Sequence, residues 1–174
     1  MDLNKEELAL KDKIAKAEGE ELVEILKLIR TEGKLALFPS IIDLLNTQKN
    51  ESIRNMIAAL LNDIKDKLAI DILADELLSQ KNEETKRIIT CACWMNGLDF
   101  SPRMDVFIKT FIEESYLVAI EALSVIENSV SNCEDDKIDA FIVDIKNAIL
   151  KEEKDKKPIL MELLSSLKDI KNAG

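Results

Sequence analysis

The feature that most constrains this sequence is a helical pattern of apolar residues that repeats about every 32 positions. Lys49-Asn50-Glu51 and Lys81-Asn82-Glu83 each precede an amphipathic segment, and the two triplets lie 32 positions apart. Apolar residues spaced three and four apart predict α-helices. Two helices per repeat expose too much apolar surface to be stable alone, so neighbouring repeats are expected to stack on a shared core. We therefore predict an all-α fold, a right-handed α-α superhelix of about four to five helix pairs.

Residues that start and stop helices set the expected boundaries. Asn4 is the expected N-cap of a first helix over about 4–17, and Gly33 is expected to end the second helix. Pro39 suits an early position in the third helix. We expect one domain over 1–174, with the parts N-terminal cap helices 1–33, best-matching repeats 34–128 and a divergent C-terminal pair 129–174.

The later repeats are expected to follow at less regular offsets. The next second helix is expected about 31 positions beyond the helix that follows Asn82. Its expected apolar residues are Tyr116, Ala119, Ile120, Leu123 and Ile126. The last pair, over about 137–150 and 154–170, is offset by about 40 positions.

Composition favours this fold and argues against nucleic acid as a partner. Only 4% of residues are aromatic, and 4 Gly and 3 Pro leave few helix breakers, so Leu, Ile, Val and Ala must fill the core. The formal net charge is −10. Binding a duplex requires a clustered basic surface, and the best basic run, 151–157, is interrupted by acids. An anionic membrane surface is disfavoured for the same reason.

The sequence predicts a cytoplasmic location. The first residues are polar and acidic, unlike a secretory signal, and no stretch approaches the roughly 20 apolar residues of a membrane span. The three cysteines, Cys91, Cys93 and Cys133, are odd in number and do not resemble a disulfide framework.

Catalytic motifs are absent from the sequence. There is no His, which removes the commonest general base near neutral pH, and no glycine-rich phosphate loop. Cys91 and Cys93 lie about 200° apart on a helix, so they cannot share a metal ion. Acids such as Asp135-Asp136 suit the first turn of the helix that follows them. We therefore expect no catalytic residues, no metal site and no cofactor.

The segment 34–64 resembles a HEAT repeat of the armadillo-like α-solenoid family. Leu37-Phe38-Pro39-Ser40-Ile41-Ile42 is similar to the first helix of that repeat, and Ile53-Arg54 is similar to the aliphatic–arginine pair of its second helix. The pair becomes Thr85-Lys86 and then Tyr116-Leu117 in the next two repeats, so the resemblance supports architecture more than ancestry. It implies a curved stack whose second helices line an inner surface that holds another protein or peptide.

Overlaying the second helices at shifts of 32 and then 31 positions predicts a partner-binding column on their outward sides. The residues proposed to contact a partner are Asn55, Asn62, Arg87, Cys91, Trp94, Val118, Glu121 and Val125. Trp94, the only Trp, has two interpretations. It either lies on the inner surface beside Cys91 and Val125, or packs beneath the loop 96–102 against Phe100 or Phe107.

The predicted function is a non-enzymatic protein-interaction module: a scaffold, adaptor or regulatory subunit. A basic or amphipathic protein or peptide would suit the acidic charge. One alternative is a HEAT-like enzyme, similar to DNA glycosylases or chromophore lyases, which the net acidic charge and the absence of His disfavour. A second alternative is self-association through exposed terminal repeats.

Overall fold

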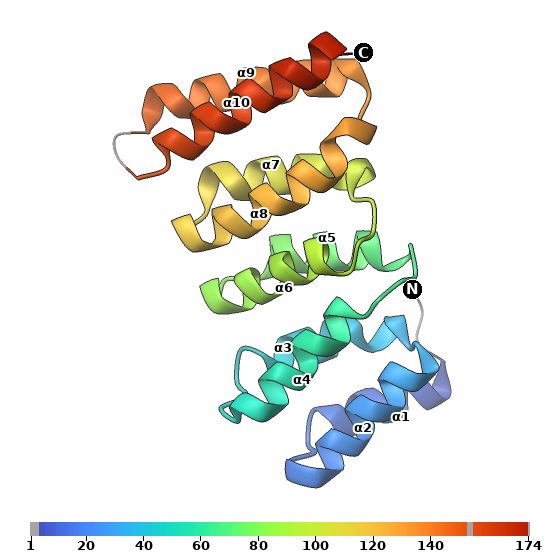
Figure 1. Cartoon of the computed structure of the whole chain (residues 1–174). Coiled ribbons are helices and arrows are strands. Elements are labelled where there is room, and N and C mark those ends of the chain that lie inside the picture. Colours follow the sequence, from blue (N-terminus) through green and yellow to red (C-terminus); the bar gives the residue numbers. More distant parts are fainter. Residues whose placement is uncertain (1–3, 153–154, 174) are drawn as a thin grey trace. The chain divides into compact units, whose positions relative to one another are not determined.

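The computed structural model describes residues 4–152 and 155–173, and within them the chain is helical with no strand, which confirms the all-α prediction. Ten α-helices and three short 3-10 turns make up this described part (Figure 1). The helices are α1 Lys5–Ile14, α2 Gly19–Glu32, α3 Phe38–Leu44, α4 Glu51–Asn62, α5 Ala69–Ser79, α6 Glu83–Met95, α7 Met104–Glu113, α8 Tyr116–Ser129, α9 Asp135–Lys151 and α10 Lys157–Ala173. None of these helices is both long enough and apolar enough to cross a membrane.

The chain divides into two compact units, Met1–Asn96 and Gly97–Gly174. We call them unit 1 and unit 2 and describe each by itself. The division falls where α6 ends and Gly97 adopts a left-handed backbone with φ 69°. The single domain expected over 1–174 stays a prediction.

Unit 1 is built from two layers of helices. The first helices of successive pairs, α1, α3 and α5, contact one another in order, and so do the second helices, α2, α4 and α6 (Figure 1). The apolar faces of both layers form the core between them, where Leu22, Ile41 and Ile57 are fully buried. Stacking is the expected solution for helices that each present one apolar face.

Burial in unit 1 repeats with the shift between the two Lys-Asn-Glu triplets, 81 − 49 = 32. Corresponding positions of α4 and α6 are buried in pairs: Ile53 and Thr85, Ile57 and Ile89, Leu60 and Ala92, Leu61 and Cys93, Ile64 and Asn96. The same shift relates Leu37, Ile41 and Leu45 of the first layer to Ala69, Leu73 and Leu77. The buried positions of the two pairs thus agree with the shift of 32 read from the sequence.

The helix ends in unit 1 follow the capping residues read from the sequence. Asn4 caps α1 in a reciprocal capping box with Glu7, and Gly33 ends α2 with φ 63°. The Asn50 side chain accepts from two backbone N–H groups at the start of α4. Asn82 accepts from the Thr85 N–H at 3.0 Å. Each amide satisfies backbone donors that the first helical turn leaves unpaired.

Unit 2 consists of two packed pairs, α7 with α8 and α9 with α10, and α7 also contacts α9. Phe100 and Phe107 meet edge to face with ring centroids 5.1 Å apart in its core. The Lys156 ammonium donates to the Ile112 and Glu114 carbonyls at the end of α7, at 2.5 and 2.8 Å. The last helix begins at Lys157; its expected start, Lys154, lies outside the described residues.

The expected register of α8 is wrong by two positions. Of the five expected apolar residues, Ala119 and Ile126 are buried, but Tyr116 is exposed, and Ile120 and Leu123 are only half-buried. A shift of 33 instead pairs buried residues of α6 with buried residues of α8: Thr85 with Val118, Ile89 with Ala122, Ala92 with Val125, Cys93 with Ile126 and Asn96 with Ser129. Two positions rotate a helix by about 200°, so the error exchanges its core side for its outward side.

Candidate partner-binding groove

A surface groove of about 280 Å³ lies between α4 and α6 in unit 1. We call it the α4–α6 groove. One wall comes from a single stripe of α4, and the other comes from α6. The lining residues are Glu51, Arg54, Asn55, Ala58 and Asn62 of α4, and Glu84, Arg87, Ile88 and Cys91 of α6.

Four of the eight predicted partner-binding residues line this groove. Asn55 and Asn62 belong to its α4 wall, and Arg87 and Cys91 belong to its α6 wall. Asn55 is exposed, whereas the other three are partly buried. The structure therefore brings together all members of the predicted column that come from α4 and two of the three that come from α6.

The unit 2 members of the predicted column are not exposed as expected. Val118 and Val125 have exposed fractions of 0% and 1%, and Glu121 is half-buried. The expectation that the two valines offer accessible surface is wrong, because the overlay placed the core side of α8 on its outward side. Trp94 is half-buried, and neither of its two proposed surroundings is established.

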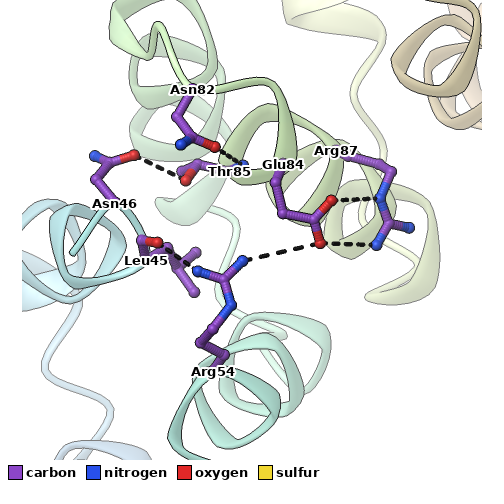
Figure 2. Close-up of polar contacts among 7 residues, drawn as sticks. All are labelled: Leu45, Asn46, Arg54, Asn82, Glu84, Thr85 and Arg87. Atoms are coloured by element: carbon purple, nitrogen blue, oxygen red, sulfur yellow. Dashed lines mark hydrogen bonds and ion pairs between the residues drawn. The ribbon is translucent and has the colours of Figure 1, made fainter. Parts of the chain in front are cut away.

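An arginine–glutamate–arginine cluster joins the two walls of the groove. Arg87 makes a two-pronged contact with Glu84: its Nε and Nη2 atoms donate to the carboxylate at 3.1 and 3.0 Å. Arg54 approaches the same carboxylate from α4, with its Nη2 3.8 Å from Oε1, and donates from Nη1 to the Leu45 carbonyl (Figure 2). A planar guanidinium suits such paired contacts.

The electrostatics of this cluster favour the ionised form of Glu84. The hydrogen bonds from Arg87 lower the pKa of the Glu84 carboxyl below its ordinary value, and the charges of Arg87 and Arg54 act in the same direction. Glu84 is half exposed, so the solvent screens these charges and the pair contributes little stability. The cluster serves mainly to hold the side chains of both walls in one arrangement.

Next to the cluster, a second polar network holds α6 against the preceding helix pair. The buried Thr85 hydroxyl donates to Asn46 Oδ1 at 2.8 Å (Figure 2). The Asn46 amide donates in turn to Gln80 Oε1 at 2.9 Å. Asn46 lies in the turn after α3, and Gln80 is the residue that ends α5. Because the network ties two turns to α6, it holds α6 beside α4 and so defines the groove.

The end of the groove near Asn62 and Cys91 is lined by sulfur-containing and weakly polar side chains. The Asn62 amide approaches the Met95 sulfur at 3.4 Å, and the Cys91 and Met95 sulfurs are 3.7 Å apart. Cys93, two positions from Cys91, points into the core, where burial raises the pKa of its thiol far above the ordinary value. The CxC pair thus has one accessible and one buried sulfur, as its helical spacing predicted.

Sequence reasoning missed Arg54, Glu84 and Met95 as parts of this surface. The repeat pattern includes Arg54 but does not place it at a groove; it lies one turn after the Asn50 cap and lines the groove wall. The three-residue spacing of Glu84 and Arg87 is the usual signal of an ion pair on one helix face. Met95 carries no such signal, since an apolar residue at the end of a helix normally faces the core.

Among the described residues, no group of three or more His, Cys, Asp or Glu side chains is placed to hold a metal ion.

The comparisons with known proteins add no relative: the chain matches no protein-family model, and neither the curated proteins nor the solved structures contain a match.

Proposed function

We propose that this chain is a non-enzymatic protein-interaction module of the HEAT-like α-solenoid type, and that it holds a partner segment in the α4–α6 groove. The observation that carries the proposal is the convergence of Asn55, Asn62, Arg87 and Cys91 on one groove. The repeat pattern alone predicts that these residues lie opposite the core. The two-layer stacking of unit 1 supports the solenoid architecture.

The chemistry of the groove suits an amphipathic segment. Asn55 and Asn62 are seven positions apart on one stripe of α4, which corresponds to about 10 Å along the helix. Within the described residues the Asn55 amide makes no hydrogen bond, so its donor and acceptor are available to a partner's polar groups. Ile88 and Cys91 offer apolar surface on the opposite wall, and the Met95 sulfur lies against the Cys91 sulfur. Ala58 leaves space between the two walls.

The partner that fits best is a basic amphipathic segment. The Arg54 and Arg87 guanidinium groups already contact Glu84, so the groove does not present a pair of unpaired cations to an acidic ligand. Glu51 lies at the rim, and the chain as a whole carries −10. Such a field speeds the encounter with a basic partner more than it tightens the final complex.

The corrected register changes which residues of α8 take the outward positions. At a shift of 33, Arg87, Cys91 and Trp94 correspond to Ile120, Ser124 and Glu127 of α8. These three α8 side chains are half-buried or exposed. They replace Val118, Glu121 and Val125 as the α8 residues proposed to contact a partner.

The proposal is tested by quantitative affinity capture from the native host with the whole chain as bait. An Ala58→Trp variant fills the groove without altering charge, and Asn128→Ala, on the exposed side of α8, serves as a matched control. We expect a protein that binds the wild type and the control but is lost from the groove-filled variant.

Two outcomes would contradict the proposal in different ways. A partner captured equally by all three baits would place the interaction outside the α4–α6 groove. Repeated capture with no protein enriched over a bait-free resin would argue against an interaction module. Circular dichroism of each bait, compared at equal concentration, shows whether the groove-filled variant keeps its helical fold.

A further inference from the structure

Unit 2 has a groove of its own, between α7 and α9, with a volume of about 400 Å³. We call it the α7–α9 groove. Its floor is apolar: Ile108 and Phe141 are buried at its base, Ile112 is half-buried, and Ala148 leaves space on the α9 side. Unlike the α4–α6 groove, it has no cluster of ion pairs among the described residues that joins its two walls.

Helix α9 also carries two exposed apolar side chains that are not part of the groove lining. Val143 is 54% exposed and Leu150 is 84% exposed. They are seven positions apart and therefore lie on one side of the helix. Isolated exposed apolar residues are common, and these two add apolar surface to α9 outside the groove lining.

The rim of the groove carries carboxylates that the protein does not neutralise. Asp105 of α7 and Asp144 of α9 take part in no hydrogen bond or ion pair within the described residues. Lys109 is already paired with Glu113 at 3.9 Å. Lys151 is the remaining cation of the rim. The described rim therefore has two unpaired acids, Asp105 and Asp144, and one unpaired base.

We propose that the α7–α9 groove binds a basic amphipathic helix of a partner protein. The floor from Phe141 to Ala148 spans seven positions, about 10 Å, which is two turns of a guest helix. A guest with apolar residues at positions i, i+4 and i+7 can place all three along this floor. Its flanking lysines or arginines then reach Asp105 and Asp144.

Charge decides between a partner helix and a second copy of this chain. Each copy carries −10, and the groove rim is itself acidic, so two copies repel each other. A cationic guest gains attraction from the same field. The proposal concerns unit 2 alone and does not depend on the function proposed for the α4–α6 groove.

The test uses the whole chain and a synthetic peptide of about 14 residues built from Ala, Lys and Leu. Its leucines occupy positions i, i+4 and i+7, and its lysines flank them. Two matched peptides carry Glu in place of each Lys, or Asn in place of each Leu. Binding is measured by fluorescence anisotropy of a labelled peptide at about 50 and 500 mM salt, where screening differs strongly.

Two variants of the protein locate the binding. Asn147→Trp covers the groove from an exposed position on α9, and Asp105→Asn with Asp144→Asn removes the unpaired acids without changing size. The control pair Glu162→Gln with Asp169→Asn removes the same charge from exposed positions of α10. Thermal melts confirm that every variant is folded.

We expect the lysine–leucine peptide to bind the wild type, to weaken at least tenfold with Asn147→Trp and about fivefold with the groove acids removed, and to be unchanged by the α10 control. Equal binding of the glutamate peptide, or equal losses in the groove and control variants, would overturn the proposal. So would a dimer of the wild-type chain in sedimentation that Asn147→Trp abolishes, because the occupant would then be a second copy.

Discussion

Helices α6 and α8 were both expected to be second helices of their pairs, yet only the core side of α6 could be identified from the sequence. α6 begins at the Asn82 cap, carries charges in its first turns, and buries Ile89, Ala92 and Cys93 on the opposite side. α8 has only two charged residues, Glu121 and Glu127, and apolar side chains on most of its circumference. Polar residues, more than apolar ones, identify which side of a repeated helix faces outward.

The largest expected effect comes from testing which side of α8 is buried. Val125→Asp places a charge in the core without a partner and should reduce the free energy of unfolding by more than about 3 kcal/mol. Leu117→Asp, at a position that is 62% exposed, should change it by less than about 0.5 kcal/mol. Urea titrations of both variants measure the difference. Similar losses in the two would restore the register first expected from the sequence.

The same comparison within α6 concerns its two cysteines. Cys93 is buried and its thiol pKa is strongly raised by burial, whereas Cys91 is half-buried at the groove. We expect Cys93 to react with Ellman's reagent more than tenfold more slowly than Cys91, because its thiol becomes accessible only through opening of the fold. Stopped-flow traces of Cys91→Ala and Cys93→Ala, both in a Cys133→Ala background, resolve the two rates. Equal rates would mean that α6 is rotated from its described position.

A smaller effect tests whether the caps define the repeat. Removing the Asn82 capping group with Asn82→Ala should cost about 1 kcal/mol of stability, and Asn50→Ala should cost a similar amount, since both amides accept backbone donors. Asn82→Asp keeps an acceptor and should retain most of the stability. Chemical denaturation checks all three variants. An Asp variant as unstable as the Ala variant would show that capping is not the reason for the loss.

The smallest effect is the pH dependence of the Glu84 cluster. Because Arg87 and Arg54 lower the folded-state pKa of Glu84, the ionised carboxylate adds stability above its ordinary pKa of 4.5, and this contribution is lost as the pH falls through the folded-state pKa. Glu84→Gln should therefore cost less than about 1 kcal/mol at pH 7 and progressively less below pH 4.5. Glu127→Gln on α8 is the control. A loss that does not shrink in acid would rule out the ion pairs as its source.

Most of the architecture of unit 1 was predictable because several local signals agree. Asn4, Gly33, Asn50 and Asn82 end or begin helices as expected, and the shift of 32 reproduces the buried positions. Only some of the residues that line the α4–α6 groove could be predicted. Asn55 and Arg87 follow from periodicity, but the contact of Arg54 with Glu84 joins residues from two helices, which spacing along the chain does not reveal.

Unit 2 was harder to predict for a different physical reason. Where nearly every side of a helix is apolar, the periodic pattern has no clear phase, so Val118 and Val125 could be assigned to either side. The α7–α9 groove was not anticipated, because its apolar floor has the same sequence signature as ordinary core. Its unpaired acids, Asp105 and Asp144, become informative only when their distance from basic partners is known.

Site-specific thiol labelling tests the central claim, that the outward sides of these repeated helices are now correctly assigned. Single cysteines would be placed at 55, 118, 125 and 127 in a chain whose three native cysteines are replaced by Ala. We expect rapid labelling at 55 and 127, which are exposed, and slow labelling at 118 and 125, which are buried. Rapid labelling at 118 and 125 with protection at 127 would contradict the corrected register of α8 and return the valines to the partner-binding column.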